Sequence, residues 1–301
     1  MKKTTQLKKM LLEKKALVVP GAYDTLSAML IEKAGFKAIQ VSGFGLTASY
    51  LGKPDVGLLT QTEMITLTKN IANAVDIPVM GDGDTGFGNA INAIRATREF
   101  EDAGCAGMNI EDQVFPKKCG HMEGKQIISL EEMVLKIEAV CDARRDPDFV
   151  INARTDAISV VGLNEAIKRG KAYAKAGADL IFVEAPKTKE EIKRVVSEID
   201  APVSINLFDG VKGGKTPLMS IEELRELGVA RVSIPVGTIF AVVRGVSNYL
   251  EALAKEGIIP DRYDLVIPFE EFKELVGLPK IKELERRYLP KEIYQERYKE
   301  G

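Results

Sequence analysis

Short runs of apolar and β-branched residues recur along the chain, and each ends in Gly, Asp, Ser or Asn before a longer segment begins. The longer segments carry apolar residues at helical spacing, as in Met64, Leu67, Ile71 and Val75. Runs that stay apolar, rather than alternating with polar residues, are typical of parallel strands buried on both faces. The pattern therefore predicts an alternating β/α chain. The expected strands are 16–19, 38–42, 78–82, 107–111, 149–153, 180–184, 202–206 and 230–235.

Eight such units in 301 residues favour a (β/α)8 barrel, the TIM barrel of the α/β class, over an open doubly wound sheet. No linker rich in Pro, Gly or Ser divides the chain. We therefore expect one catalytic barrel domain over residues 1–259, followed by a helical C-terminal extension over residues 260–301.

Composition argues against several classes of function. The 42 basic and 44 acidic residues nearly cancel, and no basic patch is interleaved with aromatic residues, so we expect no nucleic-acid binding. The apolar run Leu17–Val19 is too short for a signal peptide or a membrane span. Cys105, Cys119 and Cys141 form no paired motif, which suits a reducing compartment. We expect a soluble, cytoplasmic protein that binds no membrane. A single histidine excludes a His-rich zinc site.

The most ionisable stretch is 111–122, which begins where the strand 107–111 ends. It contains two acids, two lysines, Cys119 and the only histidine, His121. Each of these charges would need its own partner in a packed core. We therefore interpret the stretch as a functional loop above the strand end, although a solvated surface loop with a chance cysteine remains the alternative.

Polar residues also follow the other expected strands. In a TIM barrel the C-terminal ends of the strands line one mouth, where active sites lie. Each residue alone could instead cap a helix or begin a turn, but so many together predict a shared site. These residues are Ser42, Gly43, Asp82, Asp84, Glu111, Asp112, Arg154, Glu184 and Asn206.

The segment 81–88 has the features of a metal site. Asp82 and Asp84, with glycines between and after them, can approach one hard cation, and Glu111 can join directly or through water. Ligation by oxygen alone is preferred by Mg²⁺, with Mn²⁺ as a usual substitute. A calcium EF-hand does not fit because its third oxygen ligand and terminal Glu are missing, and the glycine pattern is too loose for a dinucleotide site.

Seven segments, in order, resemble the isocitrate lyase and phosphoenolpyruvate mutase superfamily from about Val19 to Arg244. They are 20–24 (PGAYD), 42–43 (SG), 53–55 (KPD), 82–86 (DGDTG), 111–113 (EDQ), 117–121 (KKCGH) and 152–157 (NARTDA). The KKCGH loop is the most specific of them. The resemblance implies a TIM barrel that binds Mg²⁺ and an α-oxyacid such as pyruvate or oxalate. It also implies a homotetramer with an exchanged C-terminal helix.

The resemblance also implies roles for individual residues. Asp82 and Asp84 would hold the metal, with Asp55 and Glu111 in its water shell, and Arg154 would hold the substrate carboxylate with Ser42 and Gly43. The expected catalytic residues are Cys119, His121, Lys117, Arg154 and Glu111. The expected substrate-binding residues are Ser42, Gly43, Phe44, Gly120, Arg154, Glu184 and Asn206.

The reaction that these implied roles support is retro-aldol cleavage of a carbon–carbon bond next to a 2-hydroxy acid. The hydroxyl must lose its proton, and Mg²⁺ lowers that cost as a Lewis acid. Cys119, between Lys118 and His121, would protonate the departing carbanion, since nearby cations bring the pKa of a thiol toward the working pH. Phosphoenolpyruvate mutases lack this cysteine, so its presence favours a lyase.

Three segments, 52–60, 121–126 and 213–217, are similar to the 2,3-dimethylmalate lyase and petal-death-protein branch. The 2-methylisocitrate lyase branch typically has Arg in place of Phe240 and Glu-Phe-Gly in the region of 211–215. The missing cation argues against a tricarboxylate unless Lys215 or Arg244 substitutes.

We expect a Mg²⁺-dependent lyase that cleaves a 2-hydroxy di- or tricarboxylate to pyruvate, or another 2-oxo acid, and a second carboxylate. The alternatives are a 2-methylisocitrate lyase that yields pyruvate and succinate, then an oxaloacetate hydrolase, then a phosphoenolpyruvate or carboxyphosphonoenolpyruvate mutase.

Overall fold

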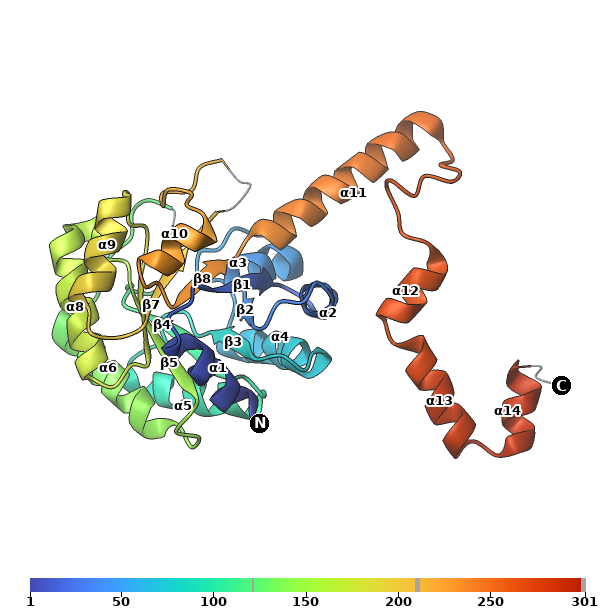
Figure 1. Cartoon of the computed structure of the whole chain (residues 1–301), viewed down its shortest axis with the longest axis horizontal. Coiled ribbons are helices and arrows are strands. Elements are labelled where there is room, and N and C mark those ends of the chain that lie inside the picture. The colour runs from blue at the N-terminus through green and yellow to red at the C-terminus, as the bar shows by residue number, and fades with distance from the viewer. Residues whose placement is uncertain (121, 209–211, 299–301) are drawn as a thin grey trace. The chain divides into compact units, whose positions relative to one another are not determined.

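The computed structural model describes residues 1–120, 122–208 and 212–298. Eight parallel strands form a closed barrel, in which each strand pairs with the next along the chain and β8 pairs with β1 (Figure 1). The (β/α)8 barrel is therefore confirmed, and the open sheet is excluded. The strands are β1 Leu17–Ala22, β2 Ile39–Val41, β3 Val79–Asp82, β4 Gly107–Glu111, β5 Val150–Thr155, β6 Leu180–Val183, β7 Val203–Asn206 and β8 Arg231–Ile234.

The strands lie where the apolar runs predicted them, but two run further than expected. Strand β1 continues to Ala22 because Pro20 pairs with Ile234 of β8 and Gly21 with Gln40 of β2. Strand β5 continues to Thr155 at the mouth of the barrel, where it pairs with β6. Its last residues are polar, so the apolar run alone ended the expected strand too early.

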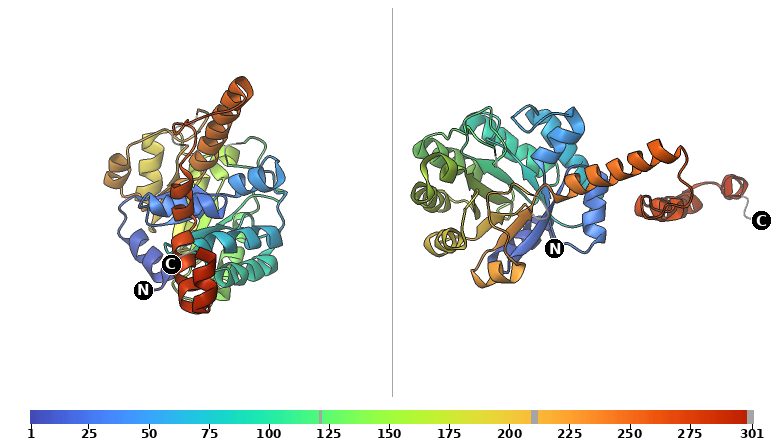
Figure 2. Two further views of the ribbon diagram at one scale, coloured as in Figure 1. Left: turned by 90° about the vertical axis from the view of Figure 1, so that its right-hand side faces the viewer. Right: turned by 90° about the horizontal axis from the view of Figure 1, so that it is seen from above.

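Helices surround the barrel on the outside, as Figure 2 shows. Several begin at side-chain caps that satisfy the first backbone N–H groups. Thr60 and Ser220 form capping boxes, and Ser129 and Thr188 each accept one backbone N–H. The helical segments around the barrel are α2 Thr25–Lys33, α3 Gly43–Leu46, η1 Thr47–Leu51, α4 Gln61–Ala74, α5 Ala90–Asp102, α6 Leu130–Ala143, α7 Ala157–Val161, α8 Leu163–Lys175, α9 Lys189–Glu198 and α10 Ile221–Glu226.

An N-terminal helix that we did not predict, α1 Lys3–Leu12, closes the end of the barrel where the strands begin. Its Leu7 and Leu11 are buried against residues at the N-terminal ends of the strands, among them Val19, Met80 and Val150. The opposite end of the barrel, where the strands finish, is thus left as the mouth.

The chain forms two compact units, Met1–Phe240 and Ala241–Gly301. The helical character of the C-terminal part is confirmed. Helix α11 Gly237–Glu256 begins in the first unit, and the second unit also contains α12 Phe269–Leu275, α13 Leu278–Tyr288 and α14 Lys291–Tyr298. The boundary at residues 259 and 260 stays a prediction. Within the described ranges, none of the helices has the length and apolar character needed to cross a membrane.

Candidate active site

One pocket at the barrel mouth collects most of the residues that the sequence predicted. Twelve expected site residues line it: Ser42, Gly43, Phe44, Asp55, Asp82, Glu111, Lys117, Cys119, Gly120, Arg154, Glu184 and Asn206. Asp84 is buried next to Lys117. His121 lies outside the described residues. The shared site is therefore a feature of the fold, while the role of each residue stays a prediction.

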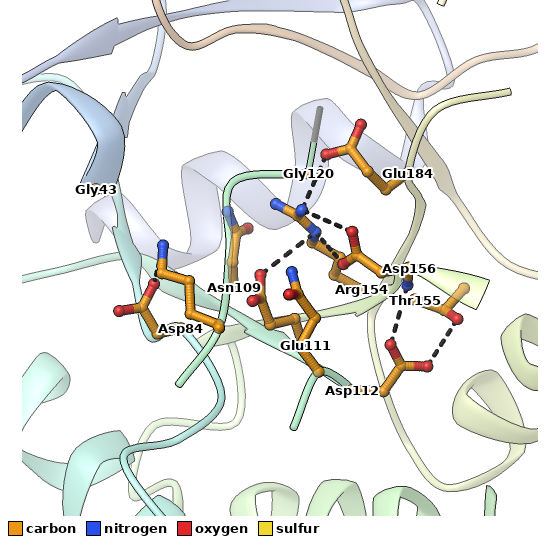
Figure 3. Close-up of polar contacts among 12 residues, drawn as sticks. Gly43, Asp84, Asn109, Glu111, Asp112, Gly120, Arg154, Thr155, Asp156 and Glu184 are labelled. Carbon is orange, nitrogen blue, oxygen red and sulfur yellow. Dashed lines mark hydrogen bonds and ion pairs between the residues drawn. The ribbon is translucent and has the colours of Figure 1, made fainter. Parts of the chain in front are cut away.

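Arg154, at the end of β5, is surrounded by three carboxylates (Figure 3). Its Nε lies 2.8 Å from Asp156 Oδ2 and 3.4 Å from Glu111 Oε2, and its Nη2 lies 3.2 Å from Glu184 Oε2. Its guanidinium also stacks on the ring of Phe182, 5.1 Å from the centroid. Burial alone would lower the pKa of Arg154, but these acids raise it well above the usual value. The result is a fixed, fully charged fork at the pocket wall, which suits a carboxylate ligand.

Asp156 orients this fork and was not predicted as a site residue. It is fully buried and accepts two hydrogen bonds from Arg154, with Nε 2.8 Å from Oδ2 and Nη2 3.1 Å from Oδ1. The Lys125 ammonium lies 2.6 Å from Oδ1. Burial raises the pKa of Asp156, but Arg154 and Lys125 lower it to about 2. Asp156 is thus a buried anion held by two cations.

Asp112 turns away from the pocket, although it follows Glu111 directly. Its Oδ2 accepts hydrogen bonds from Thr155 (2.7 Å), Tyr173 (2.8 Å) and Arg169 (3.0 Å). Its Oδ1 accepts the backbone N–H of Asp156 at 2.9 Å. Figure 3 shows this contact between the ends of β4 and β5. Asp112 therefore fixes the backbone that carries Asp156, and it is not one of a catalytic carboxylate pair.

The predicted metal ligands form an acidic cluster that contains one lysine. The Lys117 ammonium lies 2.7 Å from Asp55 Oδ1 and 2.8 Å from Asp84 Oδ1. Asp82 accepts the backbone N–H of Gly43 at 3.1 Å and of Asp84 at 3.3 Å. Burial raises the pKa of Asp84 to about 7 despite the charge of Lys117. Burial alone would lower the pKa of Lys117, but Asp84 and Asp55 raise it well above its usual value.

The chemistry of this cluster fits a hard divalent cation. Burial raises the pKa of Glu111 well above its ordinary value, and Glu111 Oε1 has no hydrogen-bond partner within the described part of the chain. A cation bound by these oxygens would favour their charged forms. Over the described residues, however, no three acid, Cys or His side chains are placed to hold one ion. In this arrangement Lys117 lies between two of the expected ligands, so the metal set stays a prediction.

The loop after β4 folds over the pocket through its backbone. The Cys119 N–H donates to the Asp55 carbonyl at 3.1 Å. The side-chain amide of Gln113 makes two hydrogen bonds to the backbone of Lys118. Its Nε2 donates to the Lys118 carbonyl at 2.8 Å, and its Oε1 accepts the Lys118 N–H at 3.0 Å. Cys119 is half-buried and lines the pocket, whereas Cys105 and Cys141 do not, and burial raises their pKa values to about 12 and about 11. Cys119 is therefore the cysteine available to a ligand in the pocket.

Below the pocket, the barrel interior is polar, which we did not predict. Arg231 is fully buried and donates to Ser204 Oγ at 3.0 Å and, more closely, to Gln40. Ser233 donates to Asn206 at 3.0 Å. Polar residues inside otherwise apolar strand runs were the available signal. The other pocket residues that we did not predict include Gln40, Asn109, Phe182, Phe208, Ser233 and Val236.

Comparison with known proteins shows likeness over most of the chain. The phosphoenolpyruvate phosphomutase family model matches residues 7–254. The chain is 45% identical over 288 residues to the 2,3-dimethylmalate lyase of Eubacterium barkeri, with 96% of this chain and 99% of that protein covered. It is 43% identical over 268 residues to the 2-methylisocitrate lyase of Aeropyrum pernix, with 89% and 85% covered.

A solved structure of phosphonopyruvate hydrolase in complex with oxalate and Mg²⁺ aligns with a TM-score of 0.87 and 32% identity. The alignment covers 96% of this chain and 100% of the hydrolase chain.

Proposed function

Since the chain belongs to the isocitrate lyase and phosphoenolpyruvate mutase superfamily and is an enzyme, we propose that it is a lyase that cleaves 2-hydroxy dicarboxylates such as 2,3-dimethylmalate. The observation that carries this proposal is the presence of Cys119 in the same pocket as Arg154 and the acidic cluster. A thiol in this place supplies the acid that carbon–carbon cleavage requires.

Substrate binding rests first on Arg154. Its charge suits a carboxylate. Asp156 fixes its orientation by accepting from Nε and Nη2, and Glu184 lies against Nη2, so the Nη1 hydrogens are left to donate to a ligand. Ser42 and Gly43 lie in the same pocket wall at the end of β2. The oxygen of Ser42 accepts the Gly45 N–H at 3.1 Å, which leaves the hydroxyl hydrogen to donate to a ligand.

Asp82 and Asp84 would hold Mg²⁺, with Mn²⁺ as a substitute, and Asp55 and Glu111 would complete its water shell. When bound, the cation would polarise the substrate 2-hydroxyl and lower the cost of removing its proton. We assign the removal of that proton to Glu111, because its carboxylate lines the same pocket as Cys119 and Arg154.

Cleavage then breaks the bond between the hydroxyl-bearing carbon and its neighbour. The hydroxyl oxygen becomes the carbonyl of a 2-oxo acid, and the electron pair passes to the departing carbon as an aci-carboxylate. Cys119 transfers its thiol proton to that carbon and is left as a thiolate. The products are a 2-oxo acid and a second carboxylate.

A dicarboxylate fits the pocket better than a tricarboxylate. Phe240, where 2-methylisocitrate lyases typically have Arg, packs edge-on against Phe44, with ring centroids 5.8 Å apart. Both rings pack against an apolar cluster of Tyr23, Val236 and Ile239. Phe44 lines the pocket and Phe240 packs against it, so a third carboxylate on this side would meet an aromatic ring instead of a cation. The A. pernix relative keeps 2-methylisocitrate lyase as the second candidate.

The test is a product screen with purified protein and Mg²⁺. The panel is 2,3-dimethylmalate, 2-methylisocitrate, isocitrate, oxaloacetate and phosphonopyruvate, and the products are identified by NMR. We expect pyruvate and propionate from 2,3-dimethylmalate at the highest kcat/KM. Preferred turnover of phosphonopyruvate would refute the lyase, and preferred turnover of 2-methylisocitrate would refute the dicarboxylate preference.

Assembly and location are part of the proposal. The resemblance supports a homotetramer, which light scattering would test. None of the three cysteines forms a disulfide, which supports the cytoplasmic location that we propose.

A further inference from the structure

Lys125 is a buried cation that the mechanism above does not use. Only 2% of its side chain is exposed. Its ammonium lies 2.6 Å from Asp156 Oδ1 and also donates to the carbonyl of Gly120, five residues earlier in the chain. One side chain therefore joins the loop that carries Cys119 to the carboxylate that orients Arg154.

Asp156 is a rigid attachment point for this link. Its side chain is hydrogen-bonded to Arg154 through both oxygens, and its backbone N–H is held by Asp112 at 2.9 Å. A lysine bound to Asp156 is consequently fixed relative to the substrate-binding fork. Its second hydrogen bond transfers that position to the loop.

Gly120 lies in direct contact with the same fork. A Cβ atom at this position would overlap Arg154 Nη2 and would lie 2.5 Å from Glu184 Oε2. The absence of a side chain lets the loop backbone reach the guanidinium, and Figure 3 shows Gly120 beside Arg154 and Glu184. Because Cys119 precedes Gly120, the hydrogen bond from Lys125 to the Gly120 carbonyl restrains the backbone next to the thiol.

We propose that Lys125 is a positioning residue that holds the segment Cys119–Gly120 over Arg154. This proposal rests on the proposed lyase function, because the thiol matters only if it delivers a proton. A buried ammonium is costly unless all its charge is partnered, and here both partners belong to the site. Without Lys125 the Gly120 carbonyl loses this hydrogen bond, and the C-terminal side of the loop is no longer attached to Asp156.

The loop is also attached at its N-terminal side, where Lys117 contacts Asp55 and Asp84. The segment Cys119–Gly120 thus lies between two buried lysines that bind opposite sides of the pocket. The two lysines bind different carboxylates, because Lys117 contacts Asp55 and Asp84 whereas Lys125 contacts Asp156. Loss of Lys125 should therefore displace the thiol without displacing the acidic cluster.

A different role for Lys125 would be to bind an anion in the outer cavity of about 800 Å³ that it lines together with Lys187 and Lys215. Its ammonium, however, is turned inward to Asp156 and Gly120. Lys187 lines the same cavity and is exposed. Lys187→Met is therefore the matched control for Lys125→Met, since it removes the same charge from the cavity without touching the loop.

The first test is amide hydrogen exchange in the peptide that covers 117–122, on the whole protein without substrate. We expect at least tenfold faster exchange in Lys125→Met than in wild type, wild-type exchange in Lys187→Met, and partial recovery in Lys125→Arg, which can still bind Asp156. Equal exchange in Lys125→Met and wild type, or equal acceleration in Lys187→Met, would overturn the proposal. If Lys125→Met does not fold, Lys125→Arg is compared with wild type instead: slower exchange or no change in Lys125→Arg would overturn it.

The second test separates kcat from KM on the substrate found in the product screen. The thiol acts only in the transition state. Its displacement in Lys125→Met should therefore lower kcat by about 10- to 100-fold while KM changes less than threefold. A rise in KM without a fall in kcat would show that Lys125 serves ligand binding and would refute a positioning role. The exchange result stands even if no lyase substrate is found, so failure of the proposed function is distinguishable from failure of this inference.

Discussion

Replacing Asp156 by Asn should destabilise the protein more than its conservative shape suggests. The amide has nearly the same volume but no charge, and its NH₂ group would face the N–H donors of Arg154 and Lys125. Removal of one partner from a buried ionic network typically costs about 3–5 kcal/mol, because the remaining charge stays buried.

The lowered pKa of Asp156 points to a stabilisation in the same direction. Its value is about 2 in the folded protein and 3.8 for the free side chain. A difference of this size corresponds to about 2 kcal/mol of stabilisation of the charged form. We therefore expect the free energy of unfolding of Asp156→Asn to be lower than that of wild type by about 2–5 kcal/mol at pH 7.

The pH dependence follows from the direction of the shift. Because the folded pKa lies below the unfolded one, the unfolded chain binds more protons between pH 4 and 2. The contribution of Asp156 is thus fully present above about pH 4 and is lost as the pH falls through about 2. The difference between wild type and Asp156→Asn should shrink over the same interval.

The assay is denaturant unfolding at a fixed protein concentration, at pH 7 and at several values between 4 and 2. Asp142→Asn, at an exposed position on α6, is the control and should stay within about 0.5 kcal/mol of wild type. A variant Asp156→Asn as stable as wild type at pH 7, or a difference that does not change down to pH 2, would show that the charge of Asp156 does not stabilise the fold.

Three further outcomes are expected. Cys119→Ser should reduce kcat by about 10²- to 10⁴-fold with little change in substrate affinity, as for loss of a general acid, and a variant within about threefold of wild type would remove the thiol from the mechanism. Mg²⁺ binding should release protons and weaken as the pH falls below about 7, because burial raises the pKa of Asp84 to about 7. Calorimetry in buffers of different ionisation enthalpy measures this proton release, and a binding heat that does not depend on the buffer would contradict it. Arg154→Lys should raise KM strongly, since a point charge does not reproduce the fork, and unchanged kinetics would show that Arg154 is structural.

The barrel and most of its mouth could be predicted from the sequence because both depend on local patterns. Parallel strands buried on both faces have to be apolar throughout, and the fold then brings every strand end to one mouth. Asp82, Glu111 and Arg154 could be placed together by this rule alone. The resemblance added Asp55 and Lys117, which follow no strand directly.

What was missed depends on contacts between distant parts of the chain. Lys125 meets Asp156 across 31 positions, and Arg231 meets Gln40 across 191, so no local pattern indicates either pair. Asp112 was expected at the shared site because it follows Glu111, but its side chain turns away from the pocket. Its orientation depends on Tyr173 and other donors on neighbouring elements, which a strand-end rule does not include.

We propose that this enzyme cleaves a carbon–carbon bond and that an exchangeable acid protonates the departing carbon. The most direct measurement is NMR of the products formed from 2,3-dimethylmalate with Mg²⁺ in D₂O. The thiol exchanges its proton with solvent, so we expect pyruvate and propionate in equal amounts, with one deuterium at C2 of each propionate. Propionate without deuterium, or no cleavage by a protein that turns over phosphonopyruvate, would contradict it.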